Sequence, residues 1–279
     1  MSIEMQRSGE ERPLAGTDVH PTEILISAVA DMLDGLRHVA VGASSPIPGS
    51  AALLAKARAE SGMRVSVLGS KRHNFFTDGG RELFDCAAQG RIDAFFLSGG
   101  QIDGSGAVNL VGIGPYPESK VRFPGSFGSA YLAFVVPRII LFREEHTPRT
   151  LVERVDFVSA PGVSAPEVYR PGGPCALITG RALFDFQREQ GRFRLRSLHP
   201  GHNLKEVIEQ TGFSFDHDAD PPQTPAPDAS TLALLRASIG DDVDALAAQA
   251  EIALALPIDD LLDAEQVSFV GRGAAVGLT

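Results

Sequence analysis

The chain has 279 residues, of which 43% are hydrophobic and 22% are charged, and its formal net charge is −10. This is the composition of an ordinary globular protein, and the negative charge argues against general binding to nucleic acid or to an anionic membrane. No apolar run approaches the length of a membrane span, and the polar start is unlike a signal peptide. The two cysteines, Cys86 and Cys175, are far apart, which argues against a disulfide or zinc framework and favours a cytoplasmic protein.

The first predicted elements alternate between helix and strand. Apolar residues at helical spacing predict a helix over 21–36, with Thr22 as its cap. A short strand over 37–42 ends in glycine, the segment 44–50 reads as a loop, and a helix rich in Ala and Leu covers 51–60.

The same alternation continues to residue 142. After a strand over 65–68 and a loop, we expect a helix, a strand, a further helix and a further strand, over 81–89, 93–97, 130–136 and 138–142. Strands that alternate with helices at this interval predict βαβ units. We therefore expect an α/β fold with an open, mostly parallel sheet and helices on both faces.

The chain divides into three parts by composition. Residues 1–18 read as a flexible N-terminal tail, and 19–220 as one α/β domain without an internal linker. A Pro-rich linker opens the last part, 221–279, whose helices over 230–239 and 245–256 we expect to pack on the domain.

Two glycine-rich turns are the most informative local features. The buried strand 93–97 runs into paired glycines, with Gln101 and Asp103 just beyond, and a second such turn covers 124–129. Glycines at strand ends let a ligand approach bare backbone amides, although a tight turn explains the spacing equally well. Candidate thioester or oxyanion ligands are Gly99, Gly100, Gln101, Asp103, Gly125 and Gly128.

Other polar residues have a structural reading beside the functional one. Asp103 is at least as well explained as a turn cap, and Asn109 as a residue that pins the same turn. We interpret His199 and His202 as structural, because Pro-Gly between them prevents a helical metal face, and we expect no metal site. The acidic loop 216–220 reads as solvated.

Four segments, in order, resemble the β-subunit half of the family I coenzyme A transferases, the glutaconate CoA-transferase type in particular. They are 90–109, 120–128, 151–162 and 197–201, within a likeness that runs from about residue 21 to 220. The resemblance implies one half of the transferase fold, an α-subunit-like partner in a heterodimer or heterotetramer, and an acyl-CoA thioester as substrate without a permanently bound cofactor. Lys71 and Arg72, on the loop after a strand, are candidates to hold the CoA phosphates, although a solvated loop explains them as well.

The chain departs from this family at the nucleophile. The resemblance implies a glutamate that attacks the thioester and passes through an anhydride and a glutamyl-CoA thioester. Leu68 or Gly69 occupies its position here, and neither can form the anhydride. The nearest acids downstream, Asp78 and Glu82, are about ten or more positions away, and nothing in the spacing places them over the thioester.

Three functions follow as expectations. The chain is expected to be the β-subunit-like component of a CoA-transferase heteromer. Alternatively, it is similar to the β-subunit of the steroid ring-cleaving CoA-thioester hydrolases, whose essential glutamate lies on the α-subunit, or it is a non-catalytic scaffold that completes the partner's active site. The apolar surface over 124–136, with Phe127, Tyr131, Leu132 and Phe134, is the expected interface. We also expect bulky side chains at Gly99 or Gly125 to block turnover more than folding.

Overall fold

A seven-stranded sheet organises the molecule. The computed structural model describes residues 19–43, 45–60 and 62–239. The sheet has the order β12-β11-β10-β8-β3-β1-β2, in which β10, β8, β3, β1 and β2 are parallel and β11 and β12 form an antiparallel edge. The strands are β1 (His38–Val41), β2 (Arg64–Val67), β3 (Ala94–Leu97), β8 (Arg138–Arg143), β10 (Pro174–Thr179), β11 (Ala182–Gln187) and β12 (Arg192–Leu198). The expected α/β fold with a mostly parallel sheet is confirmed.

Two small sheets lie beside the large one. One has the order β5-β4-β9, from β4 (Gln101–Asp103), β5 (Val108–Asn109) and β9 (Leu151–Val152). The other pairs β6 (Gly112–Ile113) with β7 (Val121–Arg122). Both follow the paired glycines after β3, so the glycine turn leads the chain out of the large sheet.

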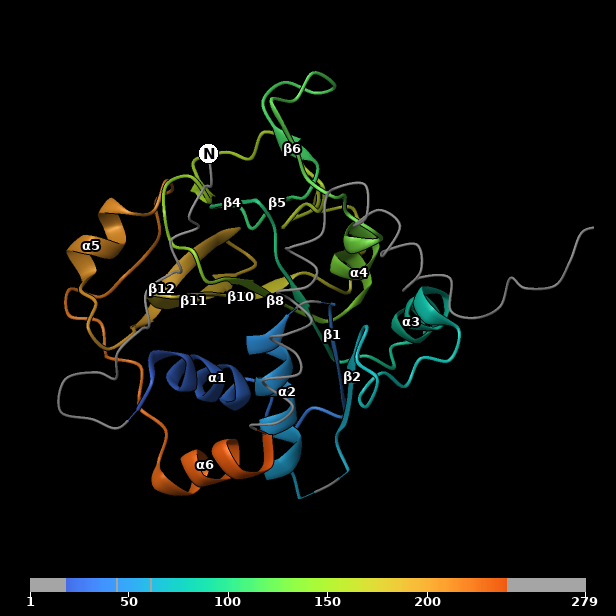
Figure 1. Cartoon of the computed structure of the whole chain (residues 1–279). Coiled ribbons are helices and arrows are strands. Elements are labelled where there is room, and N and C mark those ends of the chain that lie inside the picture. Colours follow the sequence, from blue (N-terminus) through green and yellow to red (C-terminus); the bar gives the residue numbers. More distant parts are fainter. Residues whose placement is uncertain (1–18, 44, 61, 240–279) are drawn as a thin grey trace, which may run out of the picture.

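Each face of the large sheet has its own apolar core, because successive side chains of a strand point to opposite faces. Val39 and Phe96 pack with α1 (Pro21–Asp31) and α2 (Pro46–Arg58) on one face. Phe95 and Leu97 pack with α3 (Gly79–Ala88) and α4 (Ser129–Val135) on the other. The strands β4, β5 and β9 and the helix α5 (Leu204–Glu209) also cover this second face (Figure 1).

Two helix starts differ from expectation. His20, not Thr22, caps α1: its Nδ1 accepts from Thr22 N at 3.3 Å, and its own amide donates to Glu23. The helix α2 begins at Pro46, so most of the expected loop 44–50 is helical. Proline is tolerated there because the first amides of a helix have no partner within the helix.

The last described segment returns to the α1–α2 face. After residue 220 the chain runs beside β12, where Thr224 N donates to Leu198 O at 2.7 Å. The helix α6 (Ala229–Leu234) and the π-helical turn Leu235–Ile239 follow, and Leu235 is buried in the core of α1 and α2. The expected tail 1–18 and the helix 245–256 lie outside the described residues. Within the described ranges, no helix combines the length and the apolar character that a bilayer crossing requires.

Candidate functional site

A cavity of about 310 Å³ lies where β1, β2 and β3 end. The chain passes from β1 to β2 on one side and places β3 on the other side, so the connections diverge at β1. Open parallel sheets bind ligands at such switch points, outside the carboxyl ends of the strands. The loops after all three strands line the cavity, through Gly42 after β1, Leu68 and Gly69 after β2, and Ser98 after β3.

The wall of this cavity is apolar and uncharged. Its polar groups are the hydroxyls of four serines and the amide of Asn74, and no described residue in its lining carries a charge. The serines are Ser45, Ser98, Ser126 and Ser129. Because a buried charge without a partner is strongly unfavourable, the wall suits an uncharged group better than a carboxylate.

Leu68 and Gly69, where the resemblance places the catalytic glutamate, both open into the cavity. Leu68 N donates to Val41 O at 3.0 Å, which fixes the chain beside β1, and Gly69 turns with a φ of 80°. The position therefore has the location of a nucleophile, but it has no nucleophilic side chain.

Neither nearby acid reaches this position. Asp78 precedes α3 and pairs with Arg81 at 3.2 Å. The Glu82 carboxylate accepts from Thr77 Oγ1 at 2.9 Å and from the amides of Thr77 and Asp78, and these bonds lower the pKa of its carboxyl. Gly79 and Gly80 line the cavity between them, but the two carboxylates do not.

The second glycine turn closes the cavity on the α4 side. Gly125, Ser126, Phe127 and Ser129 line it. Gly125 has a φ of 116° and open space around its α-carbon, so its backbone is accessible from the cavity. Gly128, the remaining residue of this turn, lies outside the lining, and a β-carbon on it would overlap the Phe84 ring.

The first glycine pair faces protein atoms instead. A β-carbon on Gly99 would overlap the Val108 side chain and lie 3.1 Å from Asn109 O, and one on Gly100 would overlap the Phe123 ring. Neither glycine lines the cavity. Their lack of a side chain is explained by the close packing of the chain on itself, and a role at a thioester stays a prediction.

Gln101 and Asn109 form a buried polar pair beside this turn. Gln101 Oε1 accepts from Asn109 Nδ2 at 2.7 Å and from Asp156 N at 3.0 Å, while Gln101 Nε2 donates to Asp156 Oδ2 at 3.2 Å. Asn109 Nδ2 also donates to Gly112 O at 2.7 Å. These bonds occupy the Gln101 amide within the framework, and its contact with a thioester oxygen stays a prediction.

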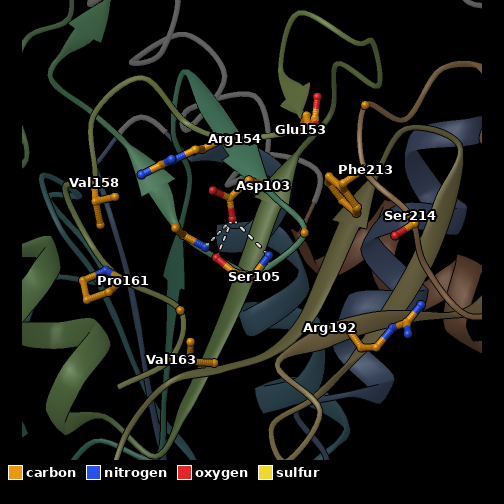
Figure 2. A pocket seen from close by; sticks show the side chains of 14 residues that line it. Asp103, Ser105, Glu153, Arg154, Val158, Pro161, Val163, Arg192, Phe213 and Ser214 are labelled. Carbon is orange, nitrogen blue, oxygen red and sulfur yellow. Dashed lines mark hydrogen bonds between the residues drawn. The ribbon is translucent and has the colours of Figure 1, made fainter. Parts of the chain in front are cut away.

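Asp103 caps its own turn. Its Oδ1 accepts from Ser105 N at 3.0 Å and from Ala107 N at 3.3 Å, and its Oδ2 accepts from Val155 N at 3.2 Å. Dashed lines in Figure 2 mark the bonds within the turn. The geometry is that of the turn-capping alternative.

A larger hollow, of about 910 Å³, lies beside Asp103 and is drawn in Figure 2. Its residues come from the turn after β4, the loop 153–163, β12 and residues 212–214, not from the ends of β1 to β3. Arg154 and Arg192 lie at opposite ends of it in Figure 2, and Arg192 pairs with Asp216 at 2.7 Å. Size alone does not make it the functional site, because its charged groups do not converge.

The remaining sequence candidates lie outside the cavity lining. Lys71 and Arg72 are exposed on the turn after β2, and their role toward CoA phosphates stays a prediction. His199 is buried: its Nε2 donates to Thr179 O at 3.0 Å, and desolvation lowers its pKa to about 4. His202 pairs with Glu206 at 3.2 Å, so the two histidines do not face one ligand.

Sequence reasoning missed three wall residues, Asn74, Ser98 and Phe127 as a cavity wall. Ser98 had a usable signal, because it directly follows the predicted strand 93–97. Asn74 had none, since it lies in the middle of a loop whose path depends on contacts with β2, such as the bond from Val67 N to His73 O.

Comparisons with known proteins agree with this geometry. A family model described as Coenzyme A transferase matches residues 22–210. The B-type half of the 3-oxoadipate CoA-transferase of Pseudomonas knackmussii is 34% identical over 155 residues, which are 53% of this chain and 59% of that protein. The B-type half of the glutaconate CoA-transferase of Acidaminococcus fermentans is 32% identical over 151 residues, 52% of this chain and 56% of that protein. The matched stretch thus spans less than two thirds of each of these two relatives.

Other matches extend further. The cholesterol ring-cleaving hydrolase IpdB subunit of Rhodococcus jostii is 27% identical over 235 residues, which cover 79% of this chain and 92% of that protein. The structure of Rhodococcus jostii IpdAB has a TM-score of 0.69 at 26% identity, covering 81% of this chain and 98% of the other. The decarboxylase AibA/AibB has a TM-score of 0.68 at 25% identity, covering 82% and 99%.

Proposed function

Because the chain belongs to the coenzyme A transferase family, we propose that it is the β-type half of a two-subunit complex that acts on an acyl-CoA thioester. An α-type partner supplies the catalytic carboxylate. The observation that carries the proposal is the cavity at the ends of β1 to β3, which has the place of the family's active site and no charged group in its described wall.

The chemistry divides between the two subunits. A carboxylate oxygen of the partner attacks the thioester carbonyl carbon, the carbon–sulfur bond breaks, and the CoA thiolate leaves. The tetrahedral intermediate before this break carries an oxyanion that needs hydrogen-bond donors. Ser98, Ser126 and Asn74 supply donors from this chain, and the Gly125 backbone lets the substrate approach.

The surface beside the cavity suits a partner. Phe127 and Tyr131 are each at least 40% exposed, and both contact the Phe84 ring, at centroid distances of 5.4 and 5.6 Å. Leu132, expected in the same surface, is buried instead and lines the cavity. Exposed aromatic residues at the rim of a cavity are typical of a subunit interface.

Co-expression with an α-type partner tests the proposal. We expect an αβ heterodimer, or its dimer, by light scattering, and release of free CoA thiol from acyl-CoA by the complex alone. Cys86 and Cys175 set a protein thiol baseline that is measured without substrate. A chain that stays monomeric beside its partner, or that turns over acyl-CoA unaided, contradicts the proposal.

Hydrolysis is the second candidate, because the similarity to the ring-cleaving hydrolase subunit extends over 92% of that protein. A hydrolase releases thiol without an added acceptor acid and incorporates ¹⁸O from labelled water into the acid product. A transferase requires the acceptor acid and forms its CoA thioester. The scaffold alternative predicts that the partner alone carries full activity.

A further inference from the structure

Phe127 adopts an unusual backbone conformation at the cavity. Its φ is 26°, and it is the only residue other than glycine with a positive φ in the described part of the chain. A bulky side chain is rarely held in this region, because its β-carbon crowds the backbone. Such strain persists only where the surroundings impose it, and it clusters at ligand sites.

Burial does not explain why a phenylalanine stands there. Phe127 is 47% exposed, so the apolar area that it removes from water is limited. Its ring contacts Phe84, which in turn meets Tyr131 edge-on at an interplanar angle of 82°. The Phe84 ring also occupies the space above Gly128. This aromatic group holds the Phe127 ring against the cavity, of which Phe127 is a wall.

The rest of the wall defines what Phe127 faces. Leu68, Leu83, Leu110 and Leu132 contribute aliphatic surface, and no described lining residue can balance a carboxylate. The volume of about 310 Å³ is roughly twice that of an apolar cavity that holds a benzene ring, about 150 Å³. A compact hydrocarbon group therefore matches the cavity in both size and polarity.

We propose that this cavity takes the uncharged hydrocarbon part of the acyl group next to the thioester, and that the Phe127 ring sets its width and is a specificity-determining residue. The proposal rests on the proposed function, since it names the substrate class for that same site. Acyl groups with a second carboxylate close to the thioester are excluded by the same wall, because the carboxylate would lose its water without gaining a partner.

The test is a calorimetric titration of the purified αβ complex with four probes: CoA, cyclohexanecarboxyl-CoA, succinyl-CoA and the wider 1-naphthoyl-CoA. We expect cyclohexanecarboxyl-CoA to bind at least tenfold more tightly than CoA, and succinyl-CoA no more tightly than CoA. In Phe127→Gly, 1-naphthoyl-CoA should gain at least tenfold relative to cyclohexanecarboxyl-CoA. Phe127→Leu should keep the preference for uncharged groups. Tyr169→Ala, at an aromatic residue that is 86% exposed and outside the cavity lining, is the matched control and should match the unsubstituted complex.

The outcomes separate the two proposals. If the complex binds neither CoA nor any thioester, the proposed function is wrong and the acyl pocket falls with it. If CoA and all three thioesters bind equally well, the proposed function stands and the acyl pocket is refuted. If Phe127→Gly keeps the original selectivity and only lowers the melting temperature, Phe127 has a structural role alone. The expected melting temperature is unchanged or higher, because glycine relieves the positive φ.

Discussion

Asn109 Nδ2 lies 2.7 Å from Gln101 Oε1, and both side chains are buried behind the first glycine turn. Asn109 also donates to Gly112 O and accepts through Oδ1 from the amides of Val111 and Gly112. One side chain therefore satisfies the chain on both sides of the connection from β5 to β6. This pair holds in place the segment that leaves the large sheet.

Replacing Asn109 with leucine should lower the free energy of unfolding by roughly 2–4 kcal/mol. The change leaves the Gln101 and Gly112 oxygens and two amides without their partner, and each buried unsatisfied group costs about 1–3 kcal/mol. The urea midpoint measures it, with Gln190→Leu on the exposed turn after β11 as the control. A midpoint equal to that of the control would remove the structural role of the pair.

The two glycine turns should respond differently to substitution. Gly99→Val should lose fold and activity together, because the new side chain meets Val108 and Asn109 O, and overpacking typically costs about 1–3 kcal/mol. The sequence-based expectation for Gly99, a loss of activity beyond the loss of fold, is revised on this ground. Gly125→Ala meets open space, so beyond the strain from its φ of 116° the effect should fall on turnover by the complex. Paired measurements of melting temperature and activity decide, and the same pattern for both variants would contradict the distinction.

Stability should fall as the pH falls from 6.5 to about 4. His146 is buried between Thr179 Oγ1 and Thr211 Oγ1, and desolvation and the nearby Arg181 lower its pKa to about 4. Desolvation lowers the pKa of His199 to about 4 as well. The unfolded chain binds these protons near pH 6.5 and the folded chain does not, so protonation favours unfolding.

The expected loss at pH 5, relative to pH 7.5, is roughly 2 kcal/mol for each of these two histidines. Urea titrations at both pH values measure it. His199→Asn should reduce the difference between the two, although it also weakens the protein at neutral pH. A stability that does not change between pH 7.5 and 5 would contradict the neutral, buried state of both rings.

The C-terminal segment should contribute to stability mainly through Leu235. Leu235→Ala should lower the free energy of unfolding by about 2–5 kcal/mol, because it empties a buried site between α1 and α2. Arg236→Gln should cost less than about 1 kcal/mol, since its pair with Glu23, at 2.6 Å, is partly solvated. Chemical denaturation compares the two, and a neutral Leu235→Ala would show that the segment does not stabilise the domain.

No covalent CoA adduct should form on this chain. Leu68 and Gly69 have no carboxylate, and the Glu82 carboxylate is held by the start of α3. Incubation of the complex with acyl-CoA, borohydride reduction and peptide mass analysis should locate any modified glutamate on the partner. A modified Asp78 or Glu82 would place the nucleophile on this chain instead.

The class of fold, the family and the missing nucleophile could all be predicted from the amino-acid sequence. Apolar spacing is a local property, so the alternation of helix and strand from residue 21 to 142 could be read directly, and the strands 37–42, 65–68 and 93–97 are confirmed within a residue. The start of α2 was misread because Pro46 and Pro48 break a helix interior but are tolerated in its first turn. The absence of a glutamate at Leu68 and Gly69 is visible without any structure.

Which glycines and polar groups face open space depends on the folded chain. Gly99 and Gly125 both follow patterns that suggest a ligand, yet Val108 fills the space at one and nothing fills it at the other. Asp103 has its lone pairs occupied by backbone amides, among them Val155, 52 residues away. The cavity itself joins the ends of three strands to a turn near residue 127. These outcomes depend on contacts between distant segments, and local spacing carries no information about what occupies the volume beside a side chain.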